Sequence, residues 1–140
     1  KQWNADRTIS VHCKEIKEIS PAIYICATDG CFGFLSSPME FEHMLLSTLM
    51  ESNTPEEWKE NLIQKWFVHF GDDSTMTILT VGFEHFSDLK MFYQERLSII
   101  EKTYGKSFSD EMNVQEREQL WQIYRKNYYR FENEDVRKEQ

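Results

Sequence analysis

Two acidic turns hold the side chains of this sequence that could do chemistry. Asp29-Gly30 ends an apolar run, and Asp72-Asp73 stands just before a β-branched run. Neighbouring strands lie about 5 Å apart, so strand ends could bring the carboxylates of Asp29 and Asp72 to one ion. Mg²⁺ and Mn²⁺ prefer hard oxygen ligands and keep several waters, so two such carboxylates would suit either ion. On spacing alone, Asp-Gly and Gly-Asp-Asp are more commonly ordinary turns in which the acid fixes its own backbone.

The turns are held by segments that the sequence predicts to be β-strands. Residues 22–28 form a continuous apolar run without polar alternation, which predicts a strand buried on both faces. Residues 75–83 are β-branched and apolar, and residues 9–16 begin with an alternating apolar and polar pattern. We therefore expect these three segments to share sheet structure.

Two helix starts lie between the acidic turns. Ser37-Pro38-Met39-Glu40 and Thr54-Pro55-Glu56-Glu57 each have an N-cap residue, proline at N1 and glutamate at N3. They predict helices over 38–51 and 55–69, packed on one face of the sheet. The residues expected on their inner faces are Met39, His43, Leu46, Met50, Trp58, Leu62, Lys65 and Trp66.

The sequence after His85 has a helical pattern. Apolar residues predict helices near 87–104, closed by Gly105, and near 114–131, with Asn113 as N-cap. A short polar loop joins them, so we expect an antiparallel pair. The aromatic residues of this part could form a recognition surface, although at helical spacing they more often form a core. They are Tyr104, Trp121, Tyr124, Tyr128, Tyr129 and Phe131.

Composition limits the classes of function. The net charge of −8 argues against a nucleic-acid partner, because phosphates require a basic surface. Cys13, Cys26 and Cys31 have no C-x-x-C spacing, so we expect neither disulfides nor a zinc site, and a reducing, cytoplasmic setting. No apolar run is long enough to span a membrane. The chain opens without methionine, which is compatible with a processed or truncated piece.

The two acidic motifs together resemble a known family. IYICATDGCFGFLSS (23–37) followed by GDDSTMTILTV (71–81) is similar to the C-terminal half of the protein phosphatase 2C family, the metal-dependent Ser/Thr phosphatases. In that family an apolar strand ends in Ser/Thr-Asp-Gly. A later strand is opened by Asp-Asn-x-Thr or, in bacterial relatives, by Asp-Asp-x-Thr. Thr28-Asp29-Gly30 resembles the first motif and Asp72-Asp73-Ser74-Thr75 the bacterial form of the second. The resemblance covers roughly residues 9–83.

The resemblance implies an α+β fold, in which the chain is part of a β-sandwich flanked by helices. Residues 1–86 would be the C-terminal half of the phosphatase 2C-like domain, and 87–140 a helical extension. Asp29 and Asp72 would be metal ligands, with Gly30 and Asp73 near the site. Two Mn²⁺ or Mg²⁺ ions in the complete site would activate a water that hydrolyses phosphoserine or phosphothreonine in a phosphoprotein substrate. No catalytic side chain is assigned, because the histidines are scattered and no Gly-x-Ser-x-Gly motif occurs.

The sequence departs from the family in one respect that bears on activity. The N-terminal half of the family supplies an acidic ligand, an Asp-Gly-x-Gly-Gly motif and an arginine that meets phosphate, and this sequence has none of them. The chain would therefore need the missing half, or another protein chain, to complete a phosphatase site. The alternative is a degenerate phosphatase-like interaction module that binds a partner protein through its C-terminal helices.

Overall fold

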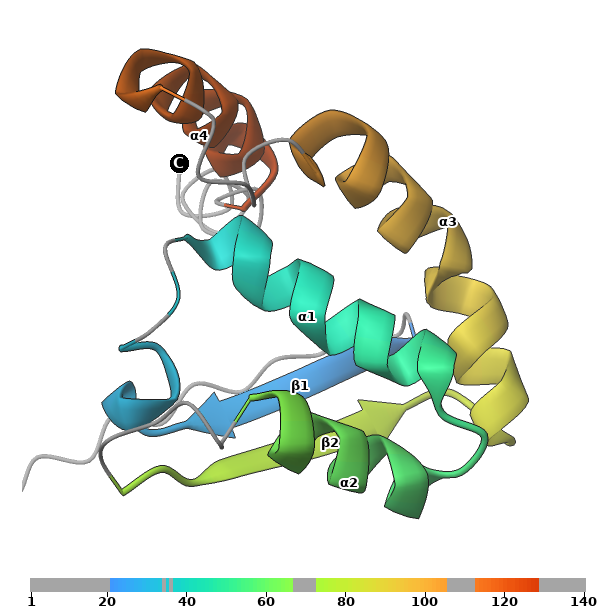
Figure 1. Cartoon of the computed structure of the whole chain (residues 1–140). Helices are drawn as coiled ribbons and strands as arrows, with labels where there is room; N and C mark the ends of the chain where they lie inside the picture. Colours follow the sequence, from blue (N-terminus) through green and yellow to red (C-terminus); the bar gives the residue numbers. More distant parts are fainter. Residues whose placement is uncertain (1–20, 34, 36, 67–72, 106–112, 129–140) are drawn as a thin grey trace, which may run out of the picture.

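The computed structural model describes residues 21–33, 35, 37–66, 73–105 and 113–128 (Figure 1). In chain order its elements are β1 (Ala22–Ala27), the 3₁₀ turn η1 (Asp29–Cys31), α1 (Pro38–Glu51), α2 (Pro55–Lys65), β2 (Met76–Val81), α3 (Phe86–Tyr104) and α4 (Val114–Tyr128). Helices with an antiparallel sheet confirm the expected α+β class. The predicted helix over 55–69 ends earlier than expected, at Lys65, with Trp66 as its C-cap. The predicted strand over 9–16 and residues 129–131 of the predicted helix over 114–131 lie outside the described residues.

β1 and β2 form an antiparallel pair in the register that places Ala27 opposite Met76. One residue further on, the Thr28 N–H donates to the Thr75 carbonyl at 3.0 Å. Hydrogen-bonded and non-hydrogen-bonded residue pairs alternate along an antiparallel ladder. Thr28 and Thr75 form a hydrogen-bonded pair, so Ala27 and Met76 form a non-hydrogen-bonded pair, and the alternation continues along both strands. The backbone groups of residues 23, 25 and 27 point to the outer edge of β1, and those of residues 76, 78 and 80 point to the outer edge of β2.

The two faces of the sheet differ in exposure. Ile23 and Ile25 of β1 and Ile78 of β2 are half-buried and pack against the core that the helices form. On the opposite face the exposed fractions are 37% for Tyr24 and 58% for Leu79. The prediction that residues 22–28 are buried on both faces is therefore wrong for the described chain, because the described helices pack against one face only.

Both predicted capping motifs begin a helix where expected. The Glu40 N–H donates to the Ser37 hydroxyl at 3.3 Å, and the Glu57 N–H donates to the Thr54 hydroxyl at 3.1 Å. The Glu57 carboxylate accepts from the Asn53 N–H at 2.7 Å, one residue before the N-cap. These contacts satisfy N–H groups that have no partner within the helix.

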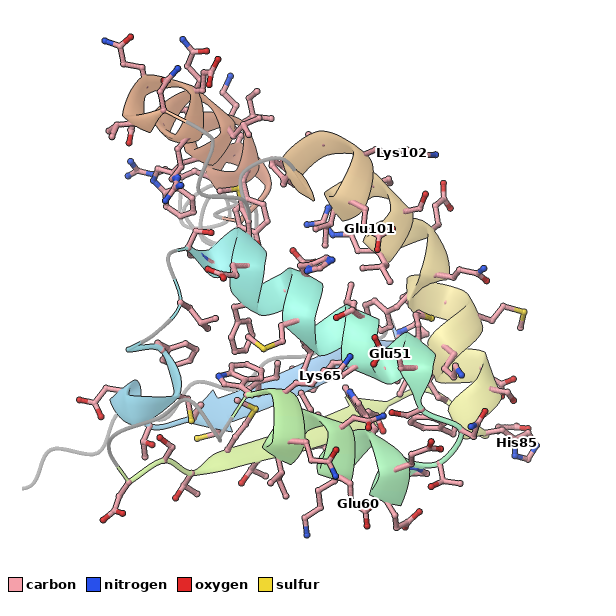
Figure 2. The ribbon with its side chains drawn as sticks, in the orientation of Figure 1. Glu51, Glu60, Lys65, His85, Glu101 and Lys102 are labelled. Atoms are coloured by element: carbon pink, nitrogen blue, oxygen red, sulfur yellow. The ribbon has the colours of Figure 1, made fainter. Side chains whose placement is uncertain are left out.

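A single core cluster joins α1, α2 and α3. Its buried members are Met39, Leu45, Leu46, Leu49, Trp58, Leu62, Trp66, Leu89, Leu97, Ile100, Tyr104 and Tyr124. Three predicted inner-face residues differ from expectation. His43 and Met50 are only half-buried, and Lys65 lies on the surface, where it pairs with Glu51 (Figure 2).

α3 packs on α1 and begins one residue earlier than predicted, because the Asp88 carboxylate accepts from the His85 N–H at 3.0 Å. Arg96 of α3 donates from Nε and Nη2 to both carboxylate oxygens of Glu42 on α1, at 2.7 Å each. This bond to Glu42 raises the pKa of Arg96. Gly105 ends the helix, as predicted, but at φ −54°, which any residue can adopt.

α4 joins the other helices mainly through Tyr124. Its hydroxyl donates to Glu42 Oε2 at 2.8 Å, and its ring meets that of Tyr104 edge-on at a centroid distance of 5.5 Å. Burial of both rings confirms the core prediction for Tyr104 and Tyr124, and Trp121 is half-buried. The side chain of Tyr128, and Tyr129 and Phe131, lie outside the described residues. The predicted antiparallel pairing of the two C-terminal helices is wrong, since the partner of α3 is α1. None of the helices in the described part is long and apolar enough to cross a membrane.

Candidate metal site at the acidic turns

Thr28 and Thr75 close the strand pair next to the acidic residues. The Thr75 N–H donates to the Thr28 hydroxyl at 3.0 Å, so the hydroxyl takes the place that a carbonyl usually holds in the ladder. The Thr28 carbonyl is therefore released, and it accepts from the Cys31 N–H at 3.0 Å. The Thr28 hydroxyl therefore accepts a bond at the end of the sheet, and the Thr28 carbonyl accepts a bond of the turn that follows.

The 3₁₀ turn η1 presents Asp29 at the surface. The Phe32 N–H donates to the Asp29 carbonyl at 2.9 Å, which closes the turn. The Asp29 side chain is exposed, and its Oδ1 accepts from the Gly30 N–H at 3.0 Å. This bond joins the side chain to the next residue, whereas in an Asx turn the aspartate bonds the backbone N–H two residues on. Asp29 Oδ2 has no hydrogen-bond partner among the described residues.

Gly30 packs directly against the second acidic turn. A Cβ added to Gly30 would lie 2.8 Å from the Asp73 carbonyl oxygen and 2.8 Å from Ser74 Oγ. Real Cβ atoms do not approach backbone oxygens so closely, so the position requires glycine. The close approach shows that the Asp29-Gly30 turn and the turn before β2 form one contiguous surface.

Cys31 and Trp66 support the turn from below. Cys31 is fully buried, and its Sγ lies 3.4 Å from the Thr75 carbonyl. The indole N–H of Trp66 donates to the Cys31 carbonyl at 3.0 Å. Cys31 therefore packs beneath the turn, whereas Phe32 is 43% exposed. Phe34 lies outside the described residues.

The predicted site residues fall into two groups. Asp29, Gly30 and Asp73 are brought together at one end of the strand pair. Asp72, the second predicted ligand, lies outside the described residues and is the chain neighbour of Asp73. Sequence reasoning missed the structural roles of Thr28, Thr75 and Trp66; the hydroxyl residue before Asp-Gly was the available signal for Thr28.

The carboxylate oxygens at this end of the strand pair suit a hard cation, but the described residues supply few of them. Asp29 and Asp73 both carry exposed carboxylates, and oxygen is the ligand atom that Mg²⁺ and Mn²⁺ take. Within the described ranges, no three His, Cys, Asp or Glu side chains stand close enough together to hold a metal ion. The described residues therefore offer part of a coordination shell.

Two polar side-chain contacts and the hydroxyl of Tyr93 lie away from this end of the strand pair. Lys65 meets Glu51 between α2 and α1 (Figure 2). His43 Nε2 lies 3.8 Å from Glu101 Oε1. Burial raises the pKa of Tyr93, although a hydrogen bond with the Ile23 backbone opposes the shift. These groups stabilise the helical layer and belong to no cluster of carboxylates.

Comparison with protein-family models, with curated proteins and with solved structures finds no match for this chain.

Proposed function

We propose that this chain supplies one part of a metal-dependent phosphoprotein phosphatase site, related to the phosphatase 2C family. The reaction would be hydrolysis of phosphoserine or phosphothreonine, in which water enters and inorganic phosphate and the free hydroxyl leave. Mn²⁺ or Mg²⁺ would be the cofactor, with Asp29 and Asp72 as ligands. Gly30 and Asp73 would shape the turns that hold them.

One observation supports this proposal most strongly. The two segments that resemble the family motifs are separated by more than forty residues, yet Gly30 and the Asp73 backbone are in contact at one end of the strand pair. A two-motif metal site needs this proximity, and the exposed aspartates, rather than the glycine contact itself, distinguish this end of the strand pair. The Thr28–Thr75 bonds hold the two backbones in register, so Asp29 and Asp73 stand on adjoining segments whose backbones are fixed.

The chain's own residues would have limited roles in the reaction. Asp29 would hold its carboxylate at the surface, while its Oδ1 bond to the Gly30 N–H restricts the side chain. Bound divalent ions would lower the pKa of a water and stabilise the phosphoryl oxygens. The described residues provide no arginine at this end for the phosphate, so we assign that role to the segment that completes the site.

The outer face of the sheet supports the view that the chain belongs to a larger layered domain. Leu79 and Val81 are 58% and 41% exposed there, beside Tyr24. An apolar sheet face of this kind is normally covered by a second layer, and a β-sandwich would supply one. The alternative, an interaction module that binds through its C-terminal helices, has less support because Tyr104 and Tyr124 are buried.

A phosphatase assay tests the proposal on a longer polypeptide, in which this chain is joined to the N-terminal half that would complete the site. The substrate is a phosphothreonine peptide with added Mn²⁺, and the variants are Asp29→Asn, Asp72→Asn and, as a control, Glu60→Gln on the exposed side of α2. We expect each aspartate variant to lose at least about 100-fold in activity, since even outer-sphere partners of metals typically cost 10–100-fold. Activity equal to the control in both aspartate variants would show that Asp29 and Asp72 are ordinary turn residues and not metal ligands. An inactive longer polypeptide that still folds would favour the interaction module.

A further inference from the structure

The outer edge of β2 has unpaired backbone groups. Met76, Ile78 and Thr80 are members of non-bonded pairs with β1, so their N–H and C=O groups point away from it. Among the described residues, none of these groups has a hydrogen-bond partner on that side. The corresponding edge of β1 differs, because the Ile23 backbone there hydrogen-bonds with Tyr93.

An apolar groove runs beside this edge. It has a volume of about 620 Å³, which is within the range of ligand sites. Its floor is formed by the same alternate β2 residues whose backbone groups are unpaired, and its opposite wall by α2. The lining residues of α2 are Pro55, Trp58, Lys59, Leu62 and Ile63, and Phe86 and Leu89 of α3 close one end. Ile63 is 46% exposed although it lines an apolar surface.

The charge around the groove is acidic. Glu56 and Glu60 each stand three residues before a groove-lining residue of α2, so both lie on the adjoining side of the helix. Asp73 precedes β2 and Glu84 follows it, and both are exposed. One lysine, Lys59, lines the groove among the described residues. A second copy of this chain, with a net charge of −8, would bring like charges to this rim.

We infer that the β2 edge and the α2 groove bind an extended strand of another protein, with alternating apolar residues and basic residues at its ends. Its main chain would extend the sheet by bonding to Met76, Ile78 and Thr80. Its alternate apolar side chains would enter the groove between β2 and α2, and its basic ends would meet the acidic rim. Backbone bonding with alternate side-chain pockets is how exposed sheet edges recognise peptides. This inference does not rest on the phosphatase proposal.

A peptide-binding experiment on the unmodified 140-residue chain tests the inference. The probe alternates threonine with isoleucine or valine and carries two lysines at each end, and binding is followed by fluorescence anisotropy. Two singly N-methylated forms are compared, with the methyl group on adjacent residues of the probe. Only alternate N–H groups of an added strand face the sheet. We therefore expect one form to bind at least about tenfold more weakly and its neighbour to keep its affinity.

Two matched variants locate the binding site. Ile63→Glu places a charge in the groove, whereas Leu79→Glu places one on the opposite face of the sheet; both residues are exposed enough to tolerate the change. Only Ile63→Glu should lower the affinity for the probe, by about tenfold or more. A probe with glutamates at its ends should bind worse than the lysine form. Absence of saturable binding, or equal affinity of the two N-methylated forms, would overturn the inference. So would self-association of the chain that Ile63→Glu abolishes, because the occupant would then be a second copy.

Discussion

The two ends of the β1–β2 pair are built alike but differ in chemistry. At each end a glycine that follows one strand lies against the backbone of a residue that precedes the other. Gly30 approaches the Asp73 carbonyl, and a Cβ on Gly82 would lie 3.0 Å from the Pro21 Cα. Close glycine contacts of this kind are therefore a structural device in this fold and do not by themselves indicate a site.

The acidic groups make the difference between the ends. Beyond Gly82, the Asp88 carboxylate is used to cap α3 through the His85 N–H. At the other end the Asp29 carboxylate is exposed at the turn, and it accepts a hydrogen bond from the neighbouring Gly30 N–H. The first end is a junction between a strand and a helix, whereas the second carries the exposed aspartates on which the proposed cation site depends. The predictions below test this contrast.

Gly30→Ala should have the largest effect on stability. The added Cβ would overlap the Asp73 carbonyl oxygen, and that backbone must move to admit it. We expect a loss of about 2–3 kcal/mol in the free energy of unfolding, as for overpacked sites. Urea unfolding measures it, with Gly33→Ala as the control because no atom lies within 4 Å of that Cβ. Equal stability of the two variants would show that the two turns are not in contact.

Gly82→Ala should cost less and should leave the acidic end intact. Gly82 has φ +85°, where an L-residue is strained, and Pro21 crowds the Cβ position. A loss of about 1–2 kcal/mol follows from the conformation alone. The same unfolding measurement applies, with Gly105→Ala as the control, since Gly105 has helical φ and open space around it. A Gly82→Ala protein as stable as this control would contradict the described turn.

Thr28→Val should have a smaller, local effect at the acidic end. The change keeps the shape of the side chain but removes the hydroxyl that accepts from the Thr75 N–H. We expect a loss of about 1 kcal/mol and faster hydrogen exchange at the Thr75 amide, measured by NMR. Thr28→Ser keeps the hydroxyl and serves as the control. Unchanged exchange at Thr75 in the valine variant would exclude the described bond.

The end near Gly82 should respond to alkaline pH through Tyr93. Burial raises the pKa of Tyr93 above its ordinary value near 10, so the folded chain holds this proton more tightly than the unfolded chain. The contribution to stability is fully present below the unfolded pKa and is lost as pH rises through the folded one. Tyr93→Phe should reduce the slope of stability against pH above about 10. A slope that is unchanged in this variant would argue against burial as its cause.

The parts of the fold that the sequence predicted well are those determined by local interactions. α1 occupies the predicted residues 38–51, because the Ser37 cap and Pro38 act within one turn. The packing of α4 was not predicted, because it depends on the bond between Tyr124 and Glu42, which are 82 residues apart. Similarly, an apolar strand does not show which of its faces the rest of the chain will cover.

The candidate site was predicted in part for the same reason. The motif residues Asp29 and Asp73 stand at strand ends, and strand ends can be located from sequence. The replacement of a ladder carbonyl by the Thr28 hydroxyl could not be predicted, because it depends on Thr75 of the other strand. The support of the turn by Trp66 likewise joins residues 35 apart.

Binding of Mn²⁺ to the 140-residue chain tests most directly whether the acidic end is a cation site. The free Mn²⁺ signal in electron paramagnetic resonance is followed as protein is added, for the unmodified chain, Asp29→Asn, Asp72→Asn and the control Glu60→Gln. Because few carboxylates at the acidic turns would hold the ion, we predict weak saturable binding, with a Kd on the order of 1 mM. Both aspartate variants should lose this binding, and the control should keep it. Equal binding by the unmodified chain and both aspartate variants would contradict the account.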